Sequence, residues 1–255
     1  MCLLVFAWRP DAIHRLVLAG NRDEFHARPA AAADWWENEI VGGKDLRAGG
    51  TWLAAHRSGR YAVVTNFREP LEEGRGPRSR GELVTNYLAH GATPEAFARD
   101  IAGRAQDYAG FNLLLGDPDT LVYLSNRGRG PEVLEPGVYG LSNHLLDTPW
   151  PKLRKTRARF EALLADGAPS GLLLEMLADR EPAAAADMPD TGIGPEWERL
   201  LSSPFIVSPH YGTRCSTVLK LLENDTMEFT ERRFDAAGDS AGESDFRFPI
   251  ERGAR

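Results

Sequence analysis

The sequence predicts an α+β protein in which antiparallel sheets are covered by layers of helices. Three observations lead to this fold class. The chain has 255 residues, of which 42% are hydrophobic, so it is long and apolar enough to bury a large core. Short β-rich runs come in pairs separated by brief turns, and such connections join antiparallel neighbours. The helical runs are grouped in pairs and do not alternate with the strands.

The predicted strands are apolar runs bounded by Gly, Pro, Asp, Asn or Ser. Brief turns predict four hairpins, which join residues 2–8 to 14–20, 51–56 to 60–66, 111–116 to 120–125 and 216–223 to 226–234. Residues 137–142 form one further strand. The glycine-rich residues 42–50 are expected to form a loop.

The first predicted helix begins at Ser79-Arg80-Gly81-Glu82, which has the Ser-x-x-Glu form of a capping box. Thr93-Pro94 starts the second, because proline is well tolerated at the first helical position. Two further helices form a second pair, and a shorter one follows, over residues 150–164, 172–178 and 195–201. The basic run within 152–159 is expected to be a solvated helix face.

The chain is expected to be a single domain over residues 1–255, because it contains no internal repeat and no convincing linker. Residues 235–245 are rich in Gly, Ala, Ser and acidic side chains and are expected to be flexible.

Composition excludes several classes of protein. There are 30 basic and 37 acidic residues, and a net charge of −7 argues against a nucleic-acid binder. Cys2 and Cys215 are the two cysteines, too few for a disulfide scaffold and without zinc spacing, so no metal or cofactor is expected. No apolar run approaches the roughly 20 residues of a membrane span, and no leader is apparent. We therefore expect a cytoplasmic protein without an integral membrane segment.

Cys2 directly follows the initiator methionine and is the first candidate for chemistry. Removal of Met1 would give Cys2 both a thiol and a free α-amine, whose ordinary pKa of about 7.7–8.0 suits a base near neutral pH. Such a pair can attack an amide or ester carbonyl. The alternative is that Cys2 is a small buried hydrophobic residue of an N-terminal strand.

Four consecutive polar residues, Asn21-Arg22-Asp23-Glu24, follow the hairpin partner of the strand that begins at Cys2. Polar side chains at the end of an apolar strand suggest a hydrogen-bonded network. In that network Asp23 would hold the ammonium group of Cys2, and Arg22 would pair with a carboxylate. The alternative is a solvated turn.

Other polar residues lie at the ends of predicted strands. Asn66, Asn126 and Asn143 each close an apolar run. A side-chain amide in this position can donate to a developing oxyanion, although asparagine is also a favoured turn residue. Arg214 enters a late strand, either as an anchor for a carboxylate or as part of a structural ion pair.

Together these segments resemble the NRDE family, which includes transport and Golgi organisation protein 2. The matching segments are Met1-Cys2-Leu3-Leu4, Asn21-Arg22-Asp23-Glu24, Gly42-Gly43-Lys44-Asp45, Ala48-Gly49-Gly50-Thr51-Trp52-Leu53, Thr65-Asn66-Phe67-Arg68, Ser79-Arg80-Gly81, 111–117, Leu141-Ser142-Asn143 and 148–152. The family is similar to N-terminal nucleophile hydrolases of the choloylglycine hydrolase and penicillin V acylase type. This resemblance implies a four-layer αββα sandwich.

The resemblance also implies residue roles. Cys2 is the nucleophile, Asp23 positions its α-amine, Asn66 and Asn143 supply oxyanion and amine contacts, and Arg214 is a late catalytic arginine. We expect three further residues to contact substrate, namely Asn21, Arg22 and Trp52, although Trp52 equally suits core packing.

One departure from the acylase pattern concerns arginine. The acylases place an arginine immediately before the Asn-x-Asp, where this chain has Gly20. Arg22 lies two residues further along the same strand and therefore keeps the same face.

The expected function is hydrolysis of the C–N bond of a small acylated metabolite. The alternative is a non-catalytic carrier on the same fold, in which the thiol of Cys2 or the ring of His26 contacts haem or a lipid or acyl ligand. The NRDE family has been linked to haem trafficking and to lipid metabolism, and haem enters only as the ligand of that alternative.

Overall fold

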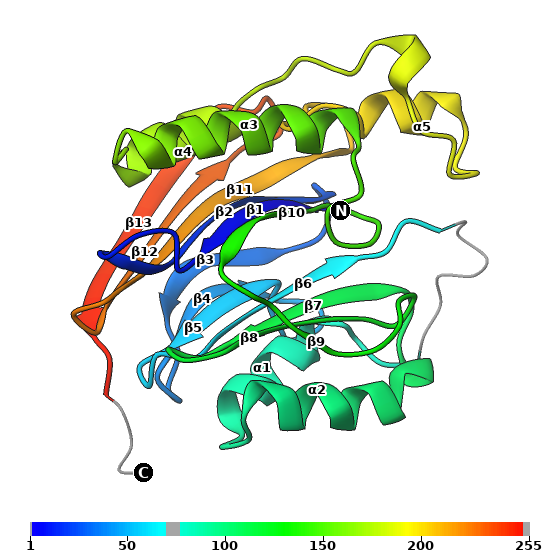
Figure 1. Cartoon of the computed structure of the whole chain (residues 1–255). Helices are drawn as coiled ribbons and strands as arrows, with labels where there is room; N and C mark the ends of the chain where they lie inside the picture. Colours follow the sequence, from blue (N-terminus) through cyan, green and yellow to red (C-terminus); the bar gives the residue numbers. More distant parts are fainter. Residues whose placement is uncertain (1, 70–76, 252–255) are drawn as a thin grey trace.

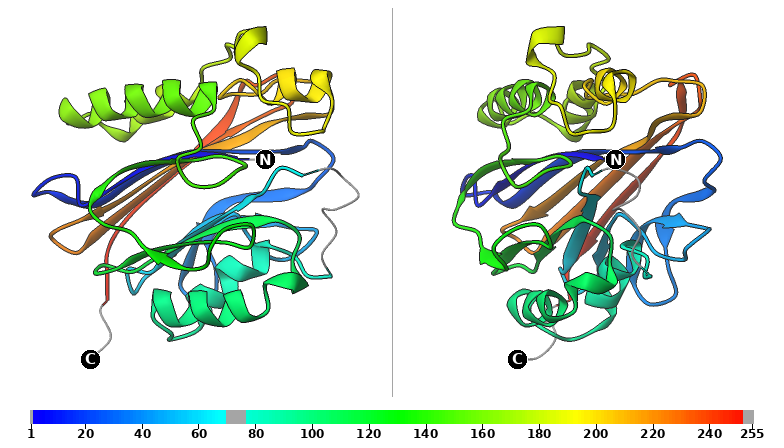
Figure 2. Two further views of the ribbon diagram at one scale, coloured as in Figure 1. Left: turned by 45° about the vertical axis from the view of Figure 1, so that its right-hand side comes forward. Right: turned by 90° about the vertical axis from the view of Figure 1, so that its right-hand side faces the viewer.

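Two antiparallel sheets pack face to face, and helices cover the outer face of each sheet (Figure 1). The computed structural model describes residues 2–69 and 77–251. Figure 2 shows the same four layers from two further directions, with helices, sheet, sheet and helices in succession. The predicted fold class, a four-layer αββα sandwich, is confirmed.

The first sheet has six strands in the order β10-β1-β2-β11-β12-β13. Their bounds are β1 Cys2–Trp8, β2 His14–Phe25, β10 Gly137–Leu141, β11 Tyr211–Leu222, β12 Thr226–Phe234 and β13 Ser240–Pro249. The hairpins predicted around residues 9–13 and 224–225 are present, and the long strands β2 and β11 pair directly with each other at its centre. The two hairpins are therefore joined side by side in one sheet.

The second sheet has seven strands in the order β3-β4-β5-β6-β7-β8-β9. Their bounds are β3 Ala30–Trp35, β4 Ile40–Asp45, β5 Leu53–His56, β6 Tyr61–Asn66, β7 Phe111–Gly116, β8 Leu121–Ser125 and β9 Glu132–Val133. Strand order follows chain order, so this sheet is built largely from local connections, as the sequence predicts.

Each pair of helices covers one sheet (Figure 1). Helices α1 (Gly81–Ala89) and α2 (Pro94–Gly103) pack on strands of the second sheet. Helices α3 (Pro151–Ala165) and α4 (Ser170–Leu177) pack on strands of the first sheet, and the short α5 (Pro195–Leu200) follows them. The predicted helical pairs are therefore the two outer layers.

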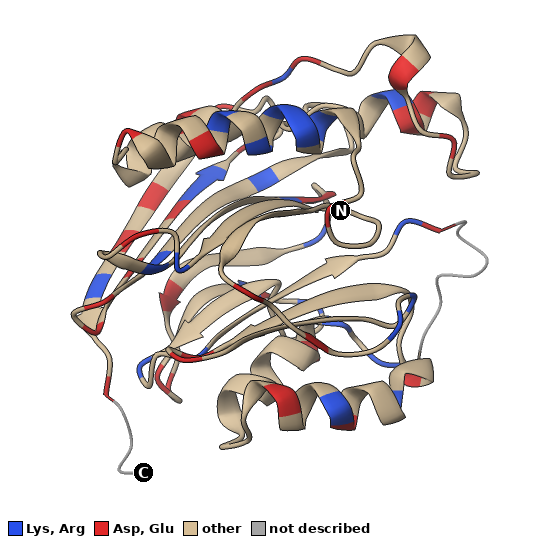
Figure 3. Cartoon of the chain, viewed as in Figure 1, with Lys and Arg blue, Asp and Glu red and all other residues tan. Residues whose placement is uncertain are grey.

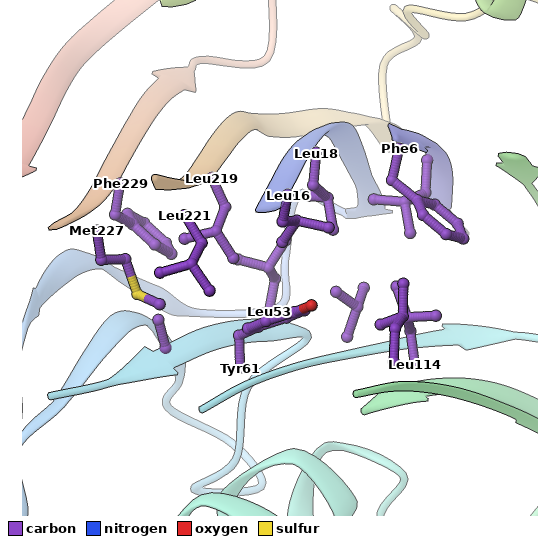
Figure 4. Packing of buried hydrophobic residues seen from close by; sticks show 14 of the residues in the cluster. Phe6, Leu16, Leu18, Leu53, Tyr61, Leu114, Leu219, Leu221, Met227 and Phe229 are labelled. Carbon is purple, nitrogen blue, oxygen red and sulfur yellow. The ribbon is translucent and has the colours of Figure 1, made fainter. Parts of the chain in front are cut away.

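Strand β1 is buried along its whole length because both of its faces are covered. Leu4 and Phe6 point into the core between the sheets, whereas Leu3 and Val5 pack against the helical layer that includes Phe160. Figure 4 shows side chains of the first sheet meeting those of the second sheet in the core between them. Burial on both faces explains why the strand is a continuous apolar run.

Two segments differ from the expectation. Residues 42–45 belong to β4 and are not a loop. A side chain at Gly42 would lie 2.8 Å from the carbonyl oxygen of Leu53, so glycine allows the two backbones to approach within a strand pair. The expected flexible segment 235–245 instead contains a turn and the first half of β13, whose residues pair with β12. Strand β13 lies at the edge of the first sheet, where most of its residues are exposed or half-buried.

The first predicted cap also differs. Ser79 makes no side-chain cap, and the carboxylate of Glu82 instead accepts a hydrogen bond from the phenol of Tyr108 at 2.8 Å. Thr93 caps α2 as predicted, by accepting a hydrogen bond from the backbone N–H of Ala96. Within the described ranges, no helix is long and apolar enough to cross a bilayer.

Candidate active site

A cavity of about 920 Å³ opens between the two sheets at the end where β1 begins. Strands of both sheets and the start of α1 contribute to its wall. Its polar wall residues include Cys2, Arg22, Asp23, Asn66, Arg80, Arg214, Cys215, Glu231 and Arg233, and Trp52 is among the apolar ones. Six of the eight residues assigned a role from the sequence therefore line one cavity, namely Cys2, Arg22, Asp23, Trp52, Asn66 and Arg214.

Cys2 begins β1, and its side chain has the same strand parity as Leu4 and Phe6, which face the second sheet. Only 6% of Cys2 is exposed, and it forms no disulfide. Burial raises the pKa of its thiol, and the nearby carboxylate of Asp23 raises it as well, while the guanidinium of Arg22 opposes both. The thiol is therefore predominantly protonated at neutral pH, and nucleophilic attack requires a base beside it.

Asp23 lies on β2, one strand away from Cys2, and is almost fully buried. Its Oδ1 accepts a hydrogen bond from the hydroxyl of Thr213 at 2.8 Å, and its backbone carbonyl accepts one from the phenol of Tyr211 at 3.0 Å. Burial raises the pKa of this carboxyl group, and neighbouring cations, Lys152 and Arg22 among them, limit the rise. A buried carboxylate of this kind favours a cation beside it.

Asn66 closes β6 and carries the side-chain amide that the second sheet contributes to the cavity wall. Asn143 is fully buried and is not part of the wall. Its amide donates to the backbone carbonyl of Asn66 at 2.9 Å, and its own backbone carbonyl accepts from the N–H of Arg68 at 2.6 Å. Asn143 therefore fixes the backbone around Asn66, and of the two asparagines only Asn66 lines the cavity.

Ser142 links this region to the nucleophile. Its hydroxyl donates to the backbone carbonyl of Cys2 at 3.1 Å, and its own carbonyl accepts from the hydroxyl of Thr65 at 3.1 Å. The start of β1 and the end of β6 are therefore tied together through residues 142–143, across the interface of the two sheets.

Asn21 does not reach the cavity. Its amide donates to the carbonyls of Leu177 and Pro204, each at 2.9 Å, and its Oδ1 accepts from the hydroxyl of Ser216 at 2.6 Å. Asn21 and Arg22 are adjacent in a strand that continues to Phe25, so their side chains point to opposite faces. Asn21 holds the helical layer against the sheet in place of the expected substrate contact.

The space at Gly20 is already filled. A side chain there would lie 2.8 Å from the carbonyl oxygen of Leu3 and 2.8 Å from a methyl group of Leu4, with the ring of Trp52 at 3.4 Å. An arginine at this position has no room, whereas Arg22, two residues further along the same face, lines the cavity. Trp52 is 7% exposed, so its ring serves as both core and wall.

Arg214 occupies a β-bulge. Thr213 pairs with Asp23, and the next paired residue is Cys215, opposite Arg22, so Arg214 is the extra residue. Because of this bulge, the side chain of Thr213 lies on the same face of the sheet as that of Asp23, and the side chain of Cys215 points towards the cavity. The guanidinium of Arg214 donates to the backbone carbonyls of Phe25 and Arg28, each at 3.0 Å. It anchors the segment that joins the two sheets, and it forms no ion pair with the described carboxylates.

Lys152 is a buried residue that sequence reasoning missed. It was expected on a solvated face with the other basic residues of α3, and Figure 3 shows Lys and Arg residues along this helix. Only 3% of Lys152 is exposed, and its ammonium group has no hydrogen-bond partner among the described residues. Burial lowers its pKa to about 8, although Asp23 acts in the opposite direction. Lys152 lies near the start of α3, which packs on β1, and this position is the feature that could have indicated its burial.

His26, a candidate haem contact, is not among the residues of the cavity wall. Its Nε2 lies 3.0 Å from the backbone carbonyl of Ser208. Among the described residues, no group of three His, Cys, Asp or Glu side chains is arranged to hold a metal ion.

The four-layer sandwich is like that of the N-terminal nucleophile hydrolases. A solved structure titled "Caenorhabditis elegans N-acylethanolamine-hydrolyzing acid amidase (NAAA) ortholog" shares this fold, with a TM-score of 0.52 and 12% identity over 86% of this chain and 92% of that one. Within this fold, the chain belongs to the Transport and Golgi organisation 2 family, which it matches over residues 1–236. Similar relatives are the Transport and Golgi organization protein 2 homologs of Bos taurus, 38% identical, and Homo sapiens, 37% identical, each aligned over 91% of this chain and 92% of the relative.

Proposed function

We propose that the protein is an N-terminal cysteine hydrolase that cleaves the C–N bond of a small acylated metabolite. The observation that carries the proposal is the position of Cys2 at the start of β1, an interior strand of its sheet, where its thiol faces a cavity of about 920 Å³. Asp23 on the neighbouring strand and Asn66 on the opposite sheet line the same cavity. This arrangement supplies a nucleophile, a carboxylate to hold an ammonium group and an amide donor for an oxyanion.

The proposed reaction begins after removal of Met1. The α-amine of Cys2 takes the proton of its own thiol, and the sulfur attacks the carbonyl carbon of the substrate amide. Asn66 donates a hydrogen bond to the resulting oxyanion. As the C–N bond breaks, the ammonium group returns its proton to the leaving nitrogen, and a thioester remains on Cys2. Water, deprotonated by the same amine, then attacks the thioester, so an amide and water give an acid and an amine.

Burial of the site supports the need for this base. Because burial raises the pKa of the Cys2 thiol, little thiolate exists at neutral pH unless a neighbouring group takes the proton. The carboxylate of Asp23 is buried and held on one side by Thr213. It favours the ammonium form that appears during attack, which is the positioning role proposed for it.

The first test of the proposal is the mass of the N-terminal peptide of the purified chain. We expect a peptide that begins at Cys2, and retained Met1 would contradict the mechanism because the α-amine would lie on the wrong residue. The second measurement is the rate at which iodoacetamide alkylates Cys2 at pH 7. We expect it to exceed the rate for free cysteine, and an equal or lower rate argues against an activated thiol.

The same preparation distinguishes a hydrolase from a carrier. A hydrolase forms an acyl adduct on Cys2 when it is mixed with an amide substrate, and the adduct is absent from Cys2→Ala. A non-catalytic carrier of haem or lipid binds its ligand reversibly and forms no covalent adduct on Cys2. Reversible binding without an adduct would therefore replace the hydrolase with the carrier.

A further inference from the structure

The wall of the cavity carries an excess of positive charge in a protein whose net charge is −7. Eight Lys and Arg residues line it against four Asp and Glu residues. Two of the four carboxylates, Glu24 and Asp45, already form salt bridges with Arg28. The remaining two, Asp23 and Glu231, are buried, and burial raises the pKa of each. Most of the cationic groups are therefore left without a carboxylate inside the cavity.

Five arginines of the wall form no salt bridge with any described carboxylate, namely Arg22, Arg47, Arg80, Arg214 and Arg233. Arg80 donates one hydrogen bond, to the backbone carbonyl of Gly110 at 2.9 Å. The Nε of Arg233 is buried without a hydrogen-bond partner among the described residues. Burial lowers the pKa of the adjacent Arg214, and Arg22 lowers it further, which is the signature of like charges held close together.

Strand register arranges these groups in a row with the nucleophile. Cys2 pairs with Arg22, Arg22 pairs with Cys215, and Cys215 pairs with Arg233. All four side chains line the cavity. Since neighbouring strands lie about 4.8 Å apart, Arg22 stands about 5 Å from Cys2 along the row, and Arg233 about 14 Å. The two arginines therefore flank Cys215 and begin one strand away from the attacking sulfur.

We propose that the substrate carries an anionic group, a carboxylate or a phosphate, a few bonds from the scissile amide, and that Arg22 and Arg233 bind it above Cys215. This inference rests on the proposed function in that it names the substrate class of the same site. Guanidinium groups bind both anions through paired N–H donors, and a partly buried pair is strengthened by the low local dielectric. An N-acylated amino acid is the simplest molecule of this kind. Binding of the anion also relieves the repulsion among the arginines.

The test measures binding by Cys2→Ala, so that turnover does not interfere. The probes are N-hexanoylglycine, N-hexanoylphosphoethanolamine and N-hexanoylethanolamine, which share the acyl amide and differ in carrying a carboxylate, a phosphate or no charge. By calorimetry we expect at least one anionic probe to bind about tenfold or more tightly than the neutral one, with an advantage that shrinks as salt is added. The better of the two anionic probes identifies the source of the charge. Equal binding of all three overturns the proposal.

Matched variants locate the anion. Arg22→Met and Arg233→Met, each combined with Cys2→Ala, are expected to reduce the advantage of the anionic probe about tenfold and to leave the neutral probe unchanged. Arg99→Met is the control, because Arg99 is exposed on α2 outside the cavity wall and its loss changes the net charge equally. If Arg99→Met reduced the advantage of the anionic probe equally, the effect would come from the net charge of the protein. That result would overturn the proposed anion site.

Hydrolysis by the chain with native Cys2 separates the two proposals. Tight binding of an anionic probe without release of hexanoic acid from any probe preserves the anion site and removes the hydrolase. Faster cleavage of the neutral probe than of either anionic probe preserves the hydrolase and overturns the anion site.

Discussion

Cys2 and Cys215 face the same cavity from strands of the same sheet, and each is 6% exposed. Arg22 lies between them in the strand register. With strand β2 between them, their Cα atoms are about 10 Å apart, which is too far for a disulfide. They are thus a matched pair of thiols with equal exposure and a shared neighbour.

Their remaining surroundings differ. Cys2 begins a strand beside Asp23, and its backbone carbonyl is held by Ser142. Cys215 lies within β11, and burial raises its pKa well above the ordinary value, with the carboxylate of Glu231 adding to the rise. Exposure therefore does not distinguish a nucleophile from an inert thiol in this cavity. What distinguishes them is access to a base, which the chain terminus supplies only to Cys2 in the proposed mechanism.

The largest expected effect separates the two thiols. Cys2→Ala is expected to lower amide hydrolysis at least about 1,000-fold, because no other group can form the thioester. Cys215→Ala is expected to stay within about threefold and to cost roughly 1 kcal/mol of stability through the lost sulfur. Release of acid from an acylated probe measures the first effect, and urea unfolding measures the second. An equally large loss of activity in Cys215→Ala would contradict the proposal that only Cys2 is the nucleophile.

The next largest effect concerns the group that distinguishes Cys2. Asp23→Asn keeps the oxygen that accepts from Thr213 and removes the negative charge. Turnover is expected to fall about 10- to 100-fold, because the ammonium form of the α-amine loses its partner. Since burial raises the pKa of Asp23, its ionised form costs stability at neutral pH, and the neutral amide removes that cost. We therefore expect an unchanged or higher melting temperature, whereas a parallel loss of stability would make Asp23 structural.

The fold could be predicted to a large extent because its hairpins are local. Strands β1 and β2 pair across a short turn, and their apolar runs are visible in the sequence. Strand β13 could not be predicted, since composition alone marks residues 235–245 as flexible and only pairing with β12 gives them a partner. The segment 42–45 was missed because glycine is rare in strands unless a neighbouring backbone lies close to it.

Candidate site residues that lie at the ends of strands could be predicted from the sequence. Residues whose place depends on the face of a strand or helix could not. The sequence predicts one network for Asn21 and Arg22 because four consecutive polar residues follow an apolar strand, whereas the strand continues to Phe25 and separates the two side chains. Lys152 was grouped with its basic neighbours on α3, and only packing of the helix on β1 buries it. Both errors concern the direction of a side chain, which no single segment of sequence contains.

A smaller effect concerns stability on the helical side of the site. Burial lowers the pKa of Lys152 to about 8 from 10.5, so the folded chain releases its proton before the unfolded chain does. Between these values the unfolded state binds more protons, and stability therefore rises with pH. Lys152 alone is expected to contribute about 2 kcal/mol between roughly pH 8 and pH 10. Lys152→Met removes this contribution, and urea unfolding of both chains at the two pH values measures the difference. An identical pH dependence would place a compensating anion beside the ammonium group.

The smallest expected effect returns to the second thiol. Glu231 is buried, its Oε1 accepts from the backbone N–H of Ala33 at 2.8 Å, and its carboxylate raises the pKa of Cys215. Glu231→Gln keeps an oxygen for that hydrogen bond and removes the charge, so alkylation of Cys215 at pH 7 is expected to rise about three- to tenfold. The rate at Cys2 in the same sample is the internal control and is expected to change less than twofold, because its base is not Glu231. An equal rise at Cys2 and Cys215 would mean that the substitution had made the cavity more accessible to the reagent. The two thiols would then differ only in how easily the reagent reaches them.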